Sequence, residues 1–316
     1  MLRPFDHSPV QQSRAWARAL ETLSPRVLSI RTADASSFEG VLHERPDEPG
    51  TLLCLHGPIL DWSKPAQEVA KQLALFIQES IVCWKETYRE IPRQLYFQPR
   101  ILKQEWKRLL HEGFSIPFTG YEESSTLQKE LESLPDHFFE RVHPRLRRTL
   151  RKTLGLDLQL VFEPFVPSAA FQIYHQSLTL TGRRKGFIVP PWSWFKALGR
   201  SDIPCLFLAQ ARYQSSSSRA WILIDQGVAH FLFGESTGPK LPGQVALGAA
   251  VQWIALTQAS NWGARRYDFH GLTLLDTAAS ANSSQSLSNY ETVSRFKKQF
   301  QGEVLSFVHP AFEIDI

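Results

Sequence analysis

The sequence predicts an α+β protein of two tandem domains, with mixed and mostly antiparallel sheets. Three observations lead to this prediction. The chain has 316 residues, which exceeds the usual size of one domain. Short β-type runs follow one another as meanders, without the regular alternation of strand and helix that a parallel sheet requires. Hydrophobic residues make up 43% of the chain, which is enough for packed cores.

The first half is expected to begin with strands and continue with helices. Each expected strand is a short apolar run between turn residues, and each expected helix has apolar residues three or four positions apart. The strands are 26–32, 38–44 and 51–57, and the helices are 63–83 and 101–113. Ser63 is expected to cap the first helix, with Pro65 in its first turn.

The polar stretch 120–136 has the composition of a connector. We therefore predict an N-terminal domain over 1–130 and a C-terminal domain over 131–316, and part of the terminal segment can return across this boundary. The second half is expected to contain helices at 138–155, 168–180 and 243–263, and strands at 156–163, 203–213, 219–227, 228–236, 265–271 and 303–310. The serine run 215–218 is expected to form a hairpin loop.

Cysteine, histidine and hydropathy patterns exclude several classes. The three cysteines are far apart and form no CxxC pair, and the ten histidines form no HExxH pattern, so we predict neither disulfides nor a metal site. The N-terminus lacks the apolar core of a signal peptide, and no stretch approaches the ~18 apolar residues of a membrane span. We expect a cytoplasmic protein without integral membrane contact, and peripheral association stays open.

Two basic segments can bind phosphates. In the predicted helix 138–155, Leu146, Leu150 and Leu154 recur four apart and take one face, so the cations crowd the opposite face. These cations are Arg141, Arg145, Arg147, Arg148, Arg151 and Lys152. An RNA backbone or a diphosphate suits that face, and an ordinary solvated face is the alternative. Arg183 and Arg184 in "GRRKGF" can clamp a phosphate, although the helix dipole also favours cations at a helix C-terminus.

Polar residues also follow two predicted strands. Asp61 and Trp62 come after "HGP", where we predict that they contact the substrate, and where a turn alone is the alternative explanation. Asp268 and His270 in "YDFHG" lie at a strand end, where each suits either proton transfer or a structural role.

The stretch "SRFKKQFQGEV" (294–304) alternates cations with aromatic rings. A solvated helix end with its rings in the core explains the pattern. Alternatively, one of its two lysines points inward, at a place where negative charge is held.

The order of these motifs resembles the Fem family of aminoacyl-tRNA-dependent peptidyltransferases, the FemABX group that builds interpeptide bridges in peptidoglycan. The matching stretches, over roughly 40–310, are "GPILDW", "RLRRTLRK", "LTGRRKGF", "AVQWIALTQASNWGARRYDFHG" and "SRFKKQFQGEV". The related BioF2-like acetyltransferases share the pattern of the second half. The resemblance implies two tandem domains of the GCN5-related N-acetyltransferase (GNAT) fold with a cleft between them.

The resemblance also implies roles for single residues. Lys297, behind Phe296, matches the family's oxyanion-stabilising lysine, and Lys298 is an ordinary surface charge. Arg183 or Arg184 matches the arginine that grips the diphosphate of a nucleotide-linked acceptor. The basic helix would face the acceptor end of tRNA or other phosphates.

The chain departs from the family at two positions that bear on the acceptor. Members commonly have arginine where this chain has His56, and glycine where it has His270.

We therefore expect an aminoacyltransferase that moves an aminoacyl group from aminoacyl-tRNA to an amine of a peptide or muropeptide precursor. We expect a monomer that needs no cofactor besides its tRNA-borne donor. One alternative is an acyl-CoA-dependent N-acyltransferase on the same scaffold. The missing Q/RxxGxG/A loop argues against it, because Leu247 stands where that loop needs glycine. The other alternative is a non-catalytic RNA-binding protein.

Overall fold

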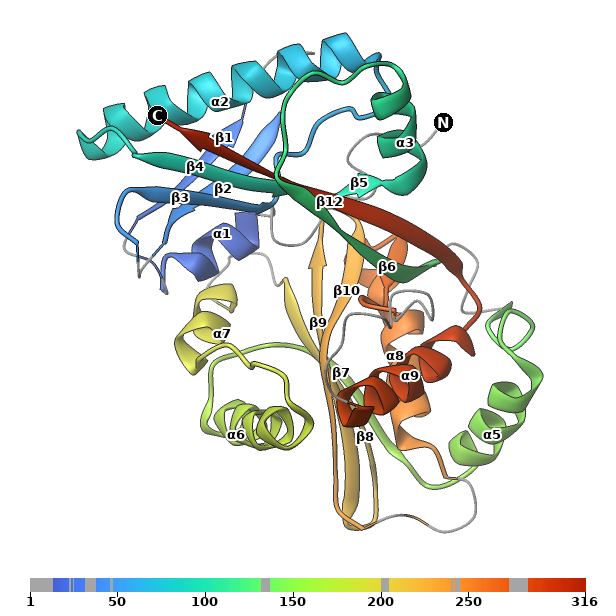
Figure 1. Cartoon of the computed structure of the whole chain (residues 1–316). Helices are drawn as coiled ribbons and strands as arrows, with labels where there is room; N and C mark the ends of the chain where they lie inside the picture. Colours follow the sequence, from blue (N-terminus) through green and yellow to red (C-terminus); the bar gives the residue numbers. More distant parts are fainter. Residues whose placement is uncertain are drawn as a thin grey trace. The chain divides into compact units, whose positions relative to one another are not determined.

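The computed structural model describes residues 14–22, 24, 26–31, 38–45, 48–131, 137–199, 205–239, 241, 245–272 and 284–316 (Figure 1). The chain divides into two compact units, one of residues 1–124 and 306–316 and the other of residues 125–305. Two long strands, β6 (Gly120–Glu130) and β12 (Glu303–Asp315), have residues in both units. Within the described part of the chain, no helix has the length and apolar character needed to cross a membrane.

The first unit contains a sheet in the order β1-β2-β3-β4-β12. Besides β12, its strands are β1 (Val27–Arg31), β2 (Glu39–Glu44), β3 (Thr51–His56) and β4 (Gln94–Pro99), and the short β5 (Ile101–Leu102) pairs with β12. Its helices are α1 (Arg14–Leu20), α2 (Ala66–Tyr88) and α3 (Lys103–His111). β3 and β4 pair in parallel, and the other neighbours pair antiparallel. Phe76 of α2 packs against Phe97 of β4 in the core, and Phe97 stacks on Phe312 at 4.7 Å between ring centroids.

The predicted start of α2 is wrong. Ser63 does not cap the helix, because its hydroxyl donates to Asp61 Oδ1 at 2.5 Å in the preceding turn and the helix begins only at Ala66. Pro65 is the N-cap residue, and its side chain makes no capping bond. The helix also extends beyond the predicted end, to Tyr88.

The second unit contains a sheet in the order β6-β11-β10-β9-β8-β7. Besides β6, its strands are β7 (Gln159–Pro164), β8 (Leu206–Tyr213), β9 (Ser216–Asp225), β10 (Val228–Thr237) and β11 (Arg266–Asp268). Its helices are α5 (Pro144–Leu154), α6 (Ala169–Lys185), α7 (Trp192–Leu198), α8 (Leu247–Gln258), the 3-10 helix η3 (Ala259–Trp262) and α9 (Ser284–Lys298). Only β10 and β11 among these neighbours pair in parallel. The predicted α+β class with mostly antiparallel sheets is confirmed.

Helices cover both faces of the second sheet, as Figure 1 shows. On one face, Ala220 of β9 joins a core with Val251 of α8. On the other face, the ring of Trp221 lies 6.0 Å from Phe171 of α6 and 4.9 Å from Phe195 of α7. The alternation of successive strand residues between the two faces explains why neighbouring residues join different clusters.

Two segments predicted as loops are strands. The connector predicted at 120–136 is wrong for 120–130, which forms β6, and residues 132–136 lie outside the described part. The hairpin loop predicted at 215–218 is also wrong, because residues 216–218 begin β9. Both segments are polar, and in the serine run hydroxyl groups bond across to β10, with Ser217 2.8 Å from Thr237 and Ser218 2.9 Å from Ser236.

Gly302, just after α9, allows two backbone segments to approach closely. A Cβ at this position would lie 2.2 Å from the carbonyl oxygen of Gln128 in β6. A backbone atom cannot move aside as a flexible side chain can, so Gly302→Ala is expected to destabilise the protein by about 1–3 kcal/mol. Chemical denaturation measures this loss. Gly120→Ala is the control, because a Cβ there meets open space, and equal losses in the two variants would contradict the prediction.

Candidate functional site

The side chain of Lys297, in the last turn of α9, points into the second unit. Only 6% of the residue is exposed. Its ammonium group donates to the carbonyl oxygens of His270 and Gly271, the latter at 2.9 Å, and lies 5.8 Å from the centroid of the Phe231 ring. An ammonium group has three N–H donors, and two of them are engaged by these carbonyls. The structure thus places inward the lysine that the sequence singled out.

A turn after β11 presents these two carbonyls to Lys297. His270 and Gly271 have positive φ values of 49° and 37°, which is an unfavourable region for a histidine. The backbone N–H of His270 donates to Asp268 Oδ1 at 2.7 Å, and this bond holds the turn in place. His270, one of the two departures from the Fem pattern, therefore occupies a backbone position that glycine adopts more easily.

Three strands in register build the site around Asp268. His230 of β10 lies opposite Asp268 of β11, and Asp268 lies opposite Gln128 of β6. Asp268 is fully buried. Its carboxylate accepts hydrogen bonds from the Thr126 hydroxyl and, at 3.0 Å, from Gln128 Nε2, so the polar residues of β6 are buried because they satisfy this carboxylate.

Two effects shift the pKa of Lys297 in opposite directions. Burial lowers the pKa of its ammonium group to about 8, and the carboxylate of Asp268 acts in the opposite direction. Burial disfavours a charged group, whereas a nearby opposite charge favours it. The ammonium form is therefore present at neutral pH and is lost on moderate alkalinisation.

Two histidines complete the cluster. His230 Nδ1 and His270 Nε2 lie 3.1 Å apart, within hydrogen-bonding distance. Among the described residues, His230, Asp268 and His270 are close enough to share a metal ion, with ligand atoms within 4.8 Å of one another. Hydrogen bonds within the cluster account for this arrangement, and the absence of a metal stays a prediction.

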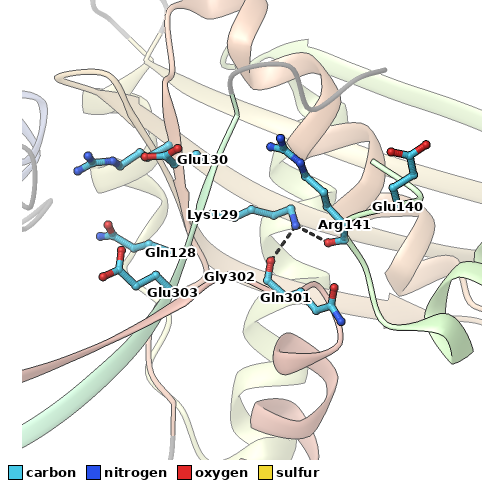
Figure 2. A pocket seen from close by; sticks show the side chains of 9 residues that line it. Gln128, Lys129, Glu130, Glu140, Arg141, Gln301, Gly302 and Glu303 are labelled. Carbon is cyan, nitrogen blue, oxygen red and sulfur yellow. Dashed lines mark hydrogen bonds between the residues drawn. The ribbon is translucent and has the colours of Figure 1, made fainter. Parts of the chain in front are cut away.

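A second buried lysine provides a comparison within the same unit. Lys129 of β6 donates to the carbonyl oxygens of Arg141, Phe300 and Gln301 at 2.6, 2.7 and 2.7 Å. Figure 2 shows it reaching toward Arg141 and Gln301. Burial lowers the pKa of Lys129 to about 8, with Arg141 adding to the shift. All three of its donors are engaged, so this lysine joins three segments and has none left for a substrate.

A pocket of about 460 Å³ lies beside Lys129 (Figure 2). Its lining mixes the cations of Arg141 and Arg266 with the carboxylates of Glu130, Glu140 and Glu303. Of the candidate residues predicted from the sequence, Arg141 lines this pocket, and the others do not.

Of the other predicted residues in the second unit, Phe296 packs on Phe300 at 5.3 Å between ring centroids. Arg183 and Arg184 are exposed in the last turn of α6. On α5, Arg145, Arg148, Arg151 and Lys152 are exposed, while Leu146 and Leu150 are buried as predicted. Arg147 is partly buried and donates to the carbonyl oxygen of Glu140 at 3.3 Å.

Three predicted residues belong to the first unit. His56 has a positive φ of 58° before the cis Gly57–Pro58 peptide bond, and its ring lies 5.0 Å from that of His309. Asp61 accepts from the N–H of Ser63, and the carbonyl oxygen of Trp62 accepts from Arg108 Nη2 at 2.6 Å. Each of these contacts is structural, and the substrate roles of the three residues stay predictions.

The sequence did not single out Thr126, Gln128, His230 or Phe231. Thr126 and Gln128 lie in the stretch interpreted as a connector, and His230 and Phe231 lie within a strand whose pattern indicates only a core position.

Comparison with known proteins identifies the fold. No protein-family model matches the chain, and no curated protein matches its sequence. The crystal structure of FemX superposes with a TM-score of 0.69 at 13% identity, covering 98% of this chain and 96% of that one. The chain has the fold of FemX. The Fem-like fold that the resemblance predicted is therefore confirmed.

Two further solved structures share the FemX-like fold. The structure of L-PGS from Bacillus licheniformis has a TM-score of 0.53 at 13% identity, covering 90% of this chain and 83% of that one. The C-terminal domain (DUF2156) of a putative lysylphosphatidylglycerol synthetase from Agrobacterium fabrum has a TM-score of 0.54 at 11% identity, with coverages of 95% and 88%. At identities this low, the similarity shows a shared fold alone.

Proposed function

We propose that the protein is an acyltransferase of the Fem type, which moves an aminoacyl group from aminoacyl-tRNA to an amine of a peptide or peptidoglycan precursor. One observation carries the proposal: Lys297 holds a buried ammonium group within a FemX-like fold, and the two carbonyls engage two of its three donors. Lys129, which joins segments of the same unit, differs in using all three of its donors on backbone carbonyls.

The reaction is aminolysis of an ester. A neutral amine attacks the ester carbonyl, a C–N bond forms, and the carbonyl oxygen becomes an oxyanion. The C–O bond to the ribose then breaks, and the proton lost by the amine ends on the ribose hydroxyl. A cation shielded from water stabilises the oxyanion far more than a cation in bulk solvent, and Lys297 is such a cation.

Asp268 acts in this proposal as a positioning residue. Its carboxylate holds the N–H of His270, and this turn aims the two carbonyls that orient Lys297. His56, Asp61 and Trp62 stay proposed acceptor contacts of the first unit, and His270 a proposed contact of the second.

Arg183 and Arg184 are proposed to bind the phosphates of a nucleotide-linked acceptor. Replacing the arginine that contacts the diphosphate by alanine should raise the KM for that acceptor about tenfold and leave kcat nearly unchanged, because a phosphate remote from the reaction is bound equally in ground and transition states. Steady-state kinetics of Arg183→Ala and Arg184→Ala measure this. Lys185→Ala, on the same exposed helix end, is the control. A fall in kcat alone would show that the role is misassigned.

The donor decides between the proposed function and its nearest rival. Purified protein is incubated with a panel of charged tRNAs or with radiolabelled acyl-CoA, each with UDP-linked muropeptides, small peptides or phosphatidylglycerol, and products are read by mass. We expect transfer from aminoacyl-tRNA to an amine. Transfer from acyl-CoA alone would identify an N-acyltransferase instead. Phosphatidylglycerol is included because two structures of this fold are titled L-PGS and putative lysylphosphatidylglycerol synthetase.

A further inference from the structure

The outer face of α6 exposes large apolar side chains. Ile173 and Leu180 are 62% and 65% exposed, and Ile188, just beyond the helix, is 92% exposed. Single exposed hydrophobic residues are normal on a protein surface, so only their grouping is informative.

Helix geometry places these residues in one stripe with a cation. Leu180 and Arg184 follow Ile173 by seven and eleven positions, so at about 100° per residue the three side chains fall within about 40° of one another around the helix. The buried residues Phe171, His175, Leu178 and Gly182 occupy the other side. The stripe therefore faces away from the sheet.

The helix end adds more positive charge and one projecting apolar residue. Arg183, Arg184 and Lys185 are exposed in the last turn, and within the part of the chain that the structure describes none of them forms an ion pair. Gly186 ends the helix with a φ of 78°, and the N–H of Phe187 donates to Gly182 O at 3.0 Å. The segment after the helix thus folds back against Gly182, while Ile188 extends into solvent.

We propose that this α6 outer face, defined as Ile173, Leu180, Arg183, Arg184, Lys185 and Ile188, binds the surface of an anionic lipid membrane. Charge complementarity selects the occupant: the cations match lipid phosphates, and the apolar side chains beside them match the acyl boundary just below the headgroups. A nucleic acid would engage the cations and leave Leu180 and Ile188 in water. This surface shares Arg183 and Arg184 with the proposed acceptor site, but the inference rests on the grouping of cations with exposed apolar side chains and does not require the transferase reaction.

The basic helix α5 provides an internal comparison. It exposes Arg145, Arg148 and Lys152, while its leucines Leu146 and Leu150 are buried. It therefore offers positive charge without apolar side chains beside it.

Vesicle co-sedimentation of the full-length protein tests the proposal. Vesicles contain phosphatidylcholine alone or an equal mixture with phosphatidylglycerol. The protein should bind the anionic vesicles, and the triple variant Ile173→Gln, Leu180→Gln, Ile188→Gln should bind about tenfold more weakly or worse. Ile91→Gln, which removes another exposed isoleucine in the first unit, should bind like wild type. Thermal unfolding of each variant confirms that it is folded.

Three results would overturn the proposal. The wild-type protein fails to bind anionic vesicles, the triple variant binds them as well as wild type, or only Arg145→Gln with Arg148→Gln abolishes binding. The triple variant retains every residue assigned to the reaction, so its activity on a soluble acceptor should persist. If membrane binding holds while no transferase activity is found, only the proposed function fails.

Discussion

Replacing Lys297 with methionine is expected to lower turnover about a hundredfold or more. Removal of one preorganised oxyanion donor typically has an effect of that size. Methionine keeps most of the apolar length of the side chain and removes a buried charge. It also leaves two carbonyl oxygens without this partner, so stability should fall somewhat while the chain stays folded. Rates measured at saturating donor and acceptor test this, and a fall of less than tenfold would remove Lys297 from the mechanism.

Lys129→Met is the matched control for this experiment. Lys129 has a pKa lowered to about 8 by burial, as Lys297 has, but its donors all bond to backbone carbonyls. Its removal leaves three carbonyl oxygens without this partner and should reduce stability, while the folded fraction keeps its turnover. Equal losses of turnover in the two variants would mean that Lys297 also acts only through structure.

The pH profile provides a second readout of the same residue. A group is protonated below its pKa, so the Lys297 ammonium donor is present below about pH 8 and is lost above it. Activity should therefore fall on the alkaline side near pH 8. This descending limb should persist in Lys129→Met and disappear from the residual activity of Lys297→Met.

Neutralising the exposed stripe of α5 should weaken the use of charged tRNA. Arg145, Arg148 and Lys152 are exposed at i, i+3 and i+7, and they share one face of the helix. The triple change to glutamine should raise the KM for aminoacyl-tRNA about tenfold or more. It should also reduce the magnitude of the slope of log affinity against log salt concentration by about 2–3. Each phosphate contact that is lost no longer releases its counterions on binding.

The control for this triple variant removes the same charge elsewhere. Lys71, Lys85 and Lys107 are exposed in the first unit, and their replacement by glutamine should leave the salt slope unchanged. The same change of slope in both triple variants would indicate an effect of net charge alone, and no change in the α5 variant would separate this helix from tRNA binding. Arg147 is left intact because it bonds to the Glu140 carbonyl.

The spacing of its leucines was sufficient to locate α5, and the succession of short β-type runs was sufficient to predict the α+β class. Leu146 and Leu150 are buried on the face that their spacing predicted. The motif around Lys297 did not choose between its two lysines, and only the resemblance to the Fem family did; the burial agrees with that choice, because Lys297 is buried whereas Lys298 is exposed. The local pattern succeeds for α5 because one face of that helix packs on the core.

The buried polar residues of β6 could not be predicted from the local sequence pattern. Thr126, Gln128 and Lys129 are polar, yet all three are buried in β6. Strand prediction depends on apolar alternation. Here most of the buried partners are the Asp268 carboxylate and the carbonyls of Phe300 and Gln301, which lie more than a hundred positions away. Only the tertiary structure supplies those partners. The polar stretch that forms β6 was therefore interpreted as a connector.

The position of β12 beside β4 has a consequence for the order in which the protein is completed. N-terminal segments emerge first during synthesis and usually fold first. Here Phe312, which stacks on Phe97 and pairs with it in the sheet, is synthesised after the entire second unit. Until then the edge of β4 that β12 covers has an open ladder of backbone groups. The unit that begins first on the ribosome is therefore the last to be finished.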